Sequence, residues 1–411
     1  PQTEPAADGA ESQAEATPEP EPQAAAPVED PWLRGLMAEH KGFRKVLADP
    51  ERYRMQVLVT VIMPGEDGPV VVEHPYRVDA EYIYPASAIK TFAAVGALRT
   101  LAQLADEGQR VGLDTPLAYC ETGRERCTID HDESNLEGGT ITVGHEIRKM
   151  QLVSNNVSFN RLYELVGHRE LNEMMWALGF ESVRIQHRMY GVQDPLAQRT
   201  TPRVELRPAK GKAVVIPERV SDLELPPLPF TPDQLLLGVA YIDDETHSRV
   251  DEPLGFAPKN YVSIRDLHRL ALAIARPDLP GVPDLGLTPA HRKHLLASMT
   301  DNPAESSNPV YADMDNGLRY KTMIGGMLEE LPITRLRYVG KAGRAYGFHL
   351  DNAYIEDTKT KRAMVVTAVA YANANGVLND NAYEYDGITR PFLRNLGQVL
   401  ARAVLVEGEG T

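Results

Sequence analysis

The sequence lacks any apolar run long enough to cross a membrane. A membrane-spanning helix needs about 20 consecutive, mostly apolar residues, and no such run occurs in the 411 residues. H-E-x-x-H, paired C-x-x-C and Gly-rich phosphate-loop motifs are also missing, so neither zinc nor a nucleotide is indicated and we expect an activity without metal or cofactor. No serine lies in a G-x-S-x-G elbow, which argues against an α/β-hydrolase.

Basic and aromatic residues are missing from residues 1–30. This segment consists mainly of Pro, Glu, Ala and Gln and supplies eight of the fifteen net negative charges. Such a composition buries too little apolar surface to offset the entropy of ordering, so we expect a disordered acidic linker. In the rest of the chain acidic and basic residues alternate closely, which argues against nucleic acid or an anionic membrane as a partner.

The chain begins with Pro rather than Met and shows no signal peptide, and a Pro/Glu/Ala tether is typical of an exported protein. We therefore expect a bacterial protein that is periplasmic or secreted, either free or held by a lipid anchor at the N-terminal linker. The only cysteines, Cys120 and Cys127, lie seven residues apart in the polar stretch CETGRERC. In an exported protein this spacing favours a local stapling disulfide, whereas in a cytosolic protein it would mean two ordinary thiols.

Segments from both ends of the chain predict one antiparallel sheet covered by two helices. The β-branched and apolar runs that predict its five strands are 55–63, 69–78, 335–343, 345–356 and 363–373. Helical spacing of apolar residues occurs at 31–49 and 388–405, with Pro391 expected in the first turn of the second helix.

Residues 86–334 consist mostly of helical patterns and separate the two halves of this sheet. The predicted fold class is therefore α/β plus all-α: a five-stranded antiparallel sheet, formed by 31–85 and 335–411 and flanked by N- and C-terminal helices, with an inserted helical domain at 86–334. Within that domain, residues 181–260 contain many prolines and few helical patterns. We expect them to form an irregular insertion that is functional or disordered.

Ser87 is the only serine with a lysine three residues later, and it stands where a polar run meets a strongly helical pattern. Residues three apart share a helix face, so Ser87 and Lys90 are expected to meet. A serine hydroxyl needs a nearby base to become a nucleophile, and a desolvated lysine is neutral often enough to serve. By itself S-x-x-K is a weak signal, because an exposed serine and a helix-face lysine give the same pattern.

Two further motifs follow in order: Ser154-Asn155-Asn156 at the end of a helix pattern, and Lys341-Ala342-Gly343 at the end of a strand pattern. The blocks YPASAIK, LVSNN and VGKAG resemble the S-x-x-K, S-D-N and K-T-G motifs of class A β-lactamases and penicillin-binding proteins. The resemblance extends from about residue 35 to 405, except for 181–260, and implies a β-lactamase/transpeptidase-like fold.

The resemblance implies a catalytic role for four residues. Ser87 would form an acyl-enzyme, and Lys90 would handle its proton. Ser154 would relay a proton to the leaving group, and Lys341 would supply positive potential and tune Ser154.

The same resemblance implies that Asn156, Gly343 and Arg344 bind the substrate. Asn156 would hold an amide side chain, and the backbone N–H groups of Ser87 and Arg344 would form the oxyanion hole. The implied substrate is a small molecule or peptide that bears a carboxylate, such as a cell-wall peptide or a β-lactam. The sequence does not predict an oligomeric state.

Three departures from the motifs matter. Asn155 replaces an Asp with a mainly structural role, and Ala342 replaces a hydroxyl residue that contacts the substrate carboxylate, a role that Arg344 could take over. The stretch QHRMYGVQDPLAQ offers no Glu to activate a deacylating water, and Asp194 is its only carboxylate. We therefore expect slow or absent β-lactam turnover.

A second hypothesis is a non-catalytic periplasmic binding or scaffolding module on the same fold. The altered third motif and the missing Glu motivate it. The retention of both lysines and both motif serines argues against it, because buried charge is costly to maintain without a use.

Overall fold

The computed structural model describes residues 27–135, 138–190, 194–311 and 321–410. Most of the predicted linker therefore lies outside the described residues, but its last residues are ordered. The N–H of Arg77 donates to Val28 O and the N–H of Asp30 to Pro75 O, both at 2.8 Å. The linker prediction thus extended too far, because residues 28–30 form backbone hydrogen bonds with residues 75–77 before the first helix begins.

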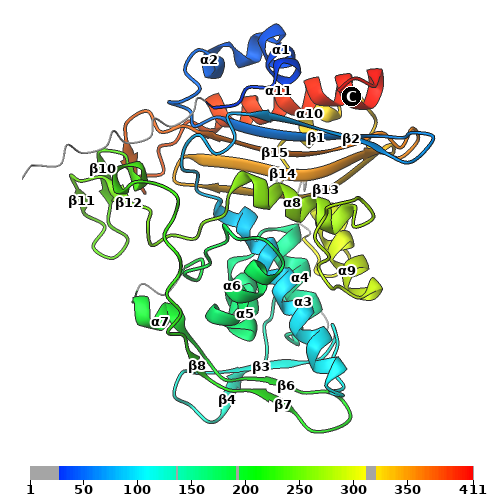
Figure 1. Cartoon of the computed structure of the whole chain (residues 1–411). Coiled ribbons are helices and arrows are strands. Elements are labelled where there is room, and N and C mark those ends of the chain that lie inside the picture. Colours follow the sequence, from blue (N-terminus) through cyan, green and yellow to red (C-terminus); the bar gives the residue numbers. More distant parts are fainter. Residues whose placement is uncertain (1–26, 136–137, 191–193, 312–320, 411) are drawn as a thin grey trace, which may run out of the picture.

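The five predicted strands form one antiparallel sheet in the order β13-β14-β15-β1-β2, which confirms the predicted fold class (Figure 1). The strands are β1 (Gln56–Met63), β2 (Val70–Tyr76), β13 (Leu336–Ala345), β14 (Phe348–Asp357) and β15 (Ala363–Tyr371). Strands β1 and β14 are buried along their whole length, because helices cover both faces of the sheet. Pro75 is accommodated in β2, an edge strand, where a missing N–H is tolerated.

Helices from both chain ends cover one face of the sheet: α1 (Pro31–Glu39), α10 (Ile324–Met327) and α11 (Arg390–Leu400) (Figure 1). Pro391 lies in the first turn of α11, as predicted. The helix predicted at 31–49 is interrupted. His40 adopts an extended backbone and its side chain accepts the N–H of Gly42, so the chain continues as a short 3₁₀ turn (Lys41–Phe43) and α2 (Arg44–Leu47).

The opposite face of the sheet packs on α8 (Ile264–Ala275) and, beyond it, on the helical region. The long helix α3 (Lys90–Asp106) is buried through most of its length. Around it lie α4 (Val143–Leu152), α5 (Asn156–Val166), α6 (His168–Ala177) and α9 (Pro289–Thr300). The sheet thus separates two hydrophobic cores, one toward the terminal helices and one toward the helical region.

Residues 181–260 contain eight short strands among the described residues, connected by irregular segments. Strands β6 (Val204–Leu206) and β7 (Val214–Ile216) join β3 (Leu117–Cys120) and β4 (Cys127–Ile129) in a four-stranded sheet at the end of the helical region away from the main sheet (Figure 1). The other elements of this stretch are α7 (Pro195–Arg199), a 3₁₀ turn (Pro232–Leu235), β5 (Thr200–Thr201), β8 (Arg219–Val220), β9 (Leu236–Leu237), β10 (Ala240–Ile242), β11 (Arg249–Val250) and β12 (Leu254–Gly255).

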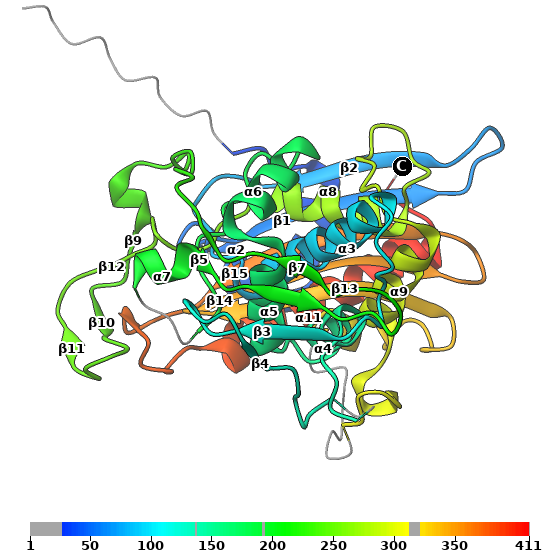
Figure 2. The same cartoon turned by 90° about the horizontal axis from the view of Figure 1, so that it is seen from below.

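The insertion pairs with a segment from the C-terminal part of the chain. Strand β10 pairs in parallel with β16 (Val377–Leu378), which follows the last strand of the main sheet. Figure 2 shows β9 to β12 gathered at one side of the molecule. Strands of two or three residues show no readable period, which is why the sequence predicted an irregular stretch here.

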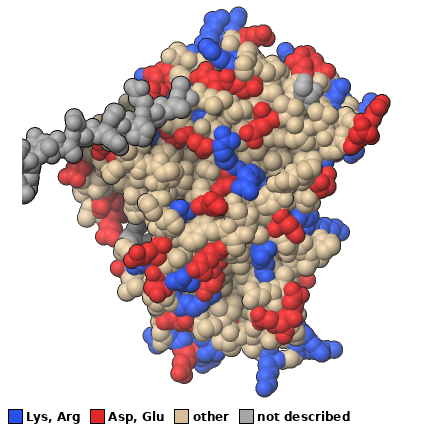
Figure 3. All heavy atoms as spheres, in the orientation of Figure 1, with Lys and Arg blue, Asp and Glu red and all other residues tan. Residues whose placement is uncertain are grey.

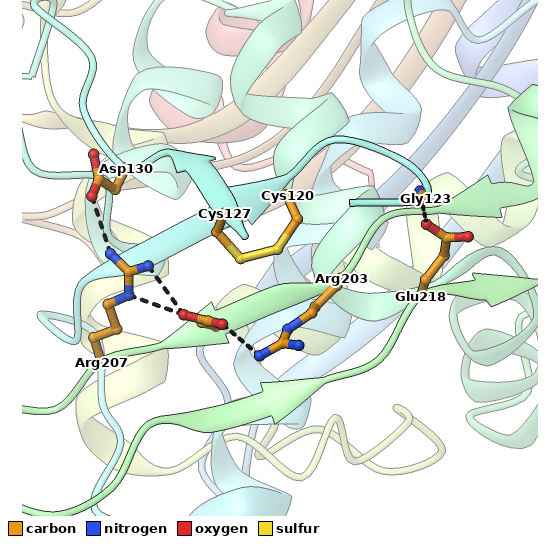
Figure 4. Close-up of a disulfide and its surroundings, with 8 residues drawn as sticks. Cys120, Gly123, Cys127, Asp130, Arg203, Arg207 and Glu218 are labelled. Atoms are coloured by element: carbon orange, nitrogen blue, oxygen red, sulfur yellow. Dashed lines mark hydrogen bonds and ion pairs between the residues drawn. A yellow bond between two sulfur atoms is a disulfide. The ribbon is translucent and has the colours of Figure 1, made fainter. Parts of the chain in front are cut away.

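Cys120 and Cys127 form a disulfide between β3 and β4, as predicted (Figure 4). On the neighbouring strand Glu205 accepts hydrogen bonds from Arg203 and Arg207. None of the described helices combines the length and the apolar character that a membrane span requires.

Two buried histidines connect the layers. His268 on α8 lies between the hydroxyls of Thr60 (2.7 Å) and Thr367 (3.0 Å). His349 on β14 lies between those of Thr322 (3.0 Å) and Thr389 (3.1 Å). Burial lowers the pKa of each imidazole to about 3, so both are neutral in the folded protein at neutral pH.

We predict that the free energy of unfolding decreases as the pH falls from about 6.5 toward about 3. An unfolded histidine protonates near pH 6.5, whereas the folded protein must keep His268 and His349 neutral until about pH 3, so protons bind preferentially to the unfolded chain over this window. Urea unfolding at a series of pH values measures the effect. The substitution His268→Gln, which retains polar atoms but does not titrate, should make the dependence shallower, and an unchanged slope would contradict the assignment.

Candidate active site

Ser87 lies in a 3₁₀ turn (Ala86–Ile89) that leads directly into α3. The preceding Ala86 has a positive φ of 46°, a conformation that costs energy for a residue with a Cβ and often occurs at functional sites. The side chain of Ser87 is half-buried. The N-terminal end of a long helix thus presents a partly accessible serine, where backbone N–H groups and the helix dipole favour negative charge.

Strand β13 is the edge strand of the main sheet and packs against this turn. A Cβ at Gly343 would lie 2.2 Å from Pro85 O and 3.1 Å from Ser87 N. Glycine is therefore required for β13 to approach the serine so closely. The predicted site residue Gly343 thus has a steric reason to be glycine.

Lys90 lies in the first turn of α3 and is completely buried. Its Nζ donates to Ser154 O at 2.6 Å and to Asn156 Oδ1 at 2.5 Å, and it lies 3.3 Å from Ser154 Oγ. The hydrogen bonds of the described residues include none between Lys90 and Ser87. The lysine predicted to meet Ser87 is thus held by the second motif.

Ser154 connects the two lysines of the site. It lies between α4 and α5 with a positive φ of 62°, and its Oγ lies 2.8 Å from Lys341 Nζ and 3.3 Å from Lys90 Nζ. Lys341 is on β13 and is buried. One hydroxyl therefore bridges two buried amines that come from the helical region and from the sheet.

The two lysines are not both protonated easily. Burial lowers the pKa of Lys90 well below its usual value, and the neighbouring Lys341 lowers it further. Burial lowers the pKa of Lys341 to about 7, partly offset by Asp351, a buried carboxylate on β14 opposite Ala342. Both amines are therefore deprotonated more easily than an exposed lysine.

A cavity of about 1190 Å³ opens beside these groups. Ser87, Asn156 and Arg344 line it, together with residues of the insertion and of the segment that precedes α11. Arg344 is exposed on β13, and its guanidinium carbon lies 5.1 Å from the centre of the Tyr385 ring. The sequence prediction ended this strand at Gly343, whereas β13 continues through Arg344 and Ala345.

Residues from 186–190 and 195–199 form a further part of the cavity wall. An ion pair that the sequence did not predict anchors them. Arg188 is buried, and its Nε lies 2.7 Å from Glu164 on α5. The same guanidinium donates to the backbone oxygens of Ala197 and Thr200. No motif marks this pair, because its two members come from separate elements.

The only carboxylate that the sequence offered in this stretch, Asp194, caps α7. Its side chain accepts the N–H of Ala197 at 2.6 Å, and it does not line the cavity. The acidic residues that do line it are Glu224 and Asp244, both exposed and both supplied by the insertion.

One group of possible metal ligands occurs in the described parts of the chain: Cys120, Cys127 and Glu205. Its two sulfur atoms form a disulfide (Figure 4), so they are not the thiolates that a metal requires. The group lies on the four-stranded sheet and does not line the cavity.

On the face seen in Figure 3, basic and acidic side chains are interspersed without a continuous region of one sign. The two lysines of the site, Lys90 and Lys341, are instead buried.

The main sheet has terminal helices on one face and the inserted helical region on the other, as the resemblance to β-lactamases implied. A family model described as the beta-lactamase enzyme family, Beta-lactamase2, matches residues 73–389. The chain therefore belongs to the beta-lactamase enzyme family.

Solved structures with a similar fold are distant in sequence. They include a beta lactamase from Xanthomonas campestris (16% identity, 90% of this chain and 96% of the other, TM-score 0.45) and one from Burkholderia vietnamiensis (16%, 94% and 100%, TM-score 0.47). A PBP-A mutant in an acyl-enzyme complex with penicillin G is also similar (16%, 90% and 96%, TM-score 0.47). No curated protein matches the chain.

Asn155 caps helix α5, which fits the structural role expected for this motif position. Its Oδ1 accepts the N–H of Ser158 at 2.9 Å. We predict that Asn155→Ala lowers the free energy of unfolding by about 1 kcal/mol, the usual cost of losing such a cap. Asn155→Asp keeps the acceptor and should retain the stability of the original protein. Urea unfolding of both variants measures this, and equal stability of the alanine variant would refute the capping role.

Proposed function

We propose that this protein is a serine hydrolase that forms an acyl-enzyme on Ser87. The observation that carries the proposal is the bridge of Ser154 Oγ between Lys341 Nζ (2.8 Å) and Lys90 Nζ (3.3 Å), next to the cavity that Ser87 lines. Buried amines with lowered pKa values are the groups that activate a hydroxyl nucleophile near neutral pH.

In the proposed acylation, Lys90 is the base. A neutral amine has two N–H donors and one lone pair; the two donors are used by Ser154 O and Asn156 Oδ1, which leaves the lone pair for an O–H group. When Ser87 Oγ attacks a carbonyl carbon, its proton passes to Lys90 Nζ, either directly or through Ser154. The backbone N–H groups of Ser87 and Arg344 then hold the oxyanion.

The second half of acylation breaks the bond between the carbonyl carbon and the leaving nitrogen or oxygen. Ser154 Oγ lies between the two lysines, so it can donate a proton to the leaving atom and recover one from a lysine. Lys341 keeps positive potential near the site while it is protonated, up to a pH of about 7 in the free protein.

Two side chains are proposed to select the substrate. Asn156 accepts from Lys90 through Oδ1, so its Nδ2 remains to donate to an amide carbonyl of the acyl group. Arg344 is exposed in the cavity and replaces the missing hydroxyl of Ala342 as the partner of a carboxylate. The proposed substrate is therefore an amide or ester that carries a carboxylate, such as a β-lactam or a cell-wall peptide.

Deacylation is proposed to be slow. Among the described residues that line the cavity, the acidic ones are Glu224 and Asp244, and both are exposed. Neither is held in a fixed, buried position from which it could orient a water toward the acyl group. Residues 186–200 contain no glutamate, and the described ones that line the cavity include glutamine and histidine.

The second candidate is a non-catalytic binding or scaffolding module, favoured by Ala342 in the third motif and by the missing glutamate. It gives no reason for two buried lysines that share a hydroxyl, an arrangement that costs stability. Either function is compatible with an oxidising compartment, and the Cys120–Cys127 disulfide supports the proposal of a periplasmic or secreted location.

We predict that penicillins add their mass to the protein through Ser87 and remain bound for minutes or longer. Intact mass spectrometry after exposure to a panel of penicillins and cephalosporins measures both the adduct and its lifetime. The Ser87→Ala variant should form none, whereas Ser158→Ala, which changes a buried serine of α5, should acylate normally. Rapid multiple turnover would refute slow deacylation, and no adduct with any compound would favour the non-catalytic module.

A further inference from the structure

The Arg344 guanidinium is held by an aromatic ring rather than by a carboxylate. Its central carbon lies 5.1 Å from the centre of the Tyr385 ring, a distance at which a cation is attracted to the face of an aromatic ring. Within the described part of the chain Arg344 forms no ion pair. Its charge therefore remains available to an anion that enters the cavity.

The acidic residues near Tyr385 in sequence are already engaged. Asp386 forms an ion pair with Arg390 at 2.8 Å. Glu384 accepts the N–H of Ala374 at 3.0 Å, and Asp380 accepts from Asn375 Nδ2 at 2.6 Å. The segment before α11 thus places the Tyr385 ring against the Arg344 guanidinium. The carboxylates of this segment interact with other residues.

Tyr385 also fixes the turn that follows the strand of Arg344. Its hydroxyl oxygen accepts the N–H of Gly347 at 2.9 Å, in the tight connection between β13 and β14. Tyr385 itself begins a π-helical turn (Tyr385–Thr389) directly before α11, and such turns are frequent at functional sites. The ring and the hydroxyl of one residue therefore hold the side chain of Arg344 and the backbone three residues later.

We infer that Tyr385 is a positioning residue for carboxylate recognition: its ring keeps the Arg344 guanidinium oriented in the cavity before the substrate binds. An unpaired arginine on the surface samples many rotamers, and ordering it on binding lowers affinity. A ring beneath the guanidinium orders the side chain in advance and so reduces the entropy lost on binding. A carboxylate partner would also order it, but it would neutralise the charge. This inference rests on the proposed function, because it assigns Arg344 to the substrate carboxylate.

The test compares the second-order rate constant for acylation by penicillin G with that for its methyl ester, which lacks the carboxylate. In Tyr385→Leu the rate constant for the acid should fall at least about threefold, while that for the ester stays within twofold of the original protein, since a cation–π contact is worth a few-fold or more in affinity. Tyr385→Phe keeps the ring and loses only the hydroxyl, so it should retain most of the preference for the acid.

Two further variants control the experiment. Tyr190→Leu alters another tyrosine of the cavity that has no cation over its ring in the described residues, and it should leave the acid-to-ester ratio unchanged. In the Arg344→Ala background, Tyr385→Leu should have no additional effect on the ratio, because the two residues act through one contact.

Two results would overturn the inference and leave Tyr385 with a structural role in the turn. One is that Tyr385→Leu lowers the rate constants for the acid and the ester equally. The other is that Tyr385→Phe lowers the rate constant for the acid as much as Tyr385→Leu does. If the original protein forms no adduct, the proposed acyl transfer fails, and calorimetric binding of penicillin G decides the inference alone. Ser87→Ala should then bind the acid at least about threefold more tightly than Ser87→Ala/Tyr385→Leu. Equal affinities, or no binding by either, would overturn it.

Discussion

The site depends on one hydroxyl, Ser154 Oγ, that lies between two buried amines. Lys90 comes from the helix behind the nucleophile and Lys341 from the edge strand of the sheet, so this contact joins the two halves of the molecule at the point where chemistry is proposed. Two cations cannot easily coexist at such a place, and burial together with mutual repulsion lowers the pKa of Lys90. The same constraint that destabilises the charges favours the neutral amine that the proposed mechanism needs as a base.

Other features of the fold serve to maintain this contact. Gly343 allows β13 to lie against the turn of Ser87, and Asp351 beneath the strand keeps the pKa of Lys341 from falling further. The Glu164–Arg188 ion pair fixes the wall of the cavity. The described lining of this wall contains no buried carboxylate. The proposed formation of an acyl-enzyme does not need one, because it uses the lysines. Hydrolysis of the acyl-enzyme does need a base for water, so we propose that it is slow.

The sequence predicted the main sheet because its strands are long, apolar and bounded by polar turns, and it predicted Ser87, Lys90, Ser154 and Lys341 because they fall in recognisable motifs. It did not predict the hydrogen bonds from Lys90 to Ser154 and Asn156, since tertiary contacts between separate segments leave no local pattern. Tyr385 was missed for the same reason. The strands of 181–260 were missed because two or three residues show no period, and the break at His40 depends on one side-chain hydrogen bond.

The most direct test of this account is the titration of the two lysine amines by NMR, with Lys90→Arg and Lys341→Arg variants to assign the signals. The account predicts that Lys341 Nζ titrates near pH 7 and that Lys90 Nζ also titrates well below the usual lysine value of about 10.4, with each lysine shifting the titration of the other. Two lysines that both titrate near the usual value, without coupling, would contradict the account, because neither would then be a base at neutral pH.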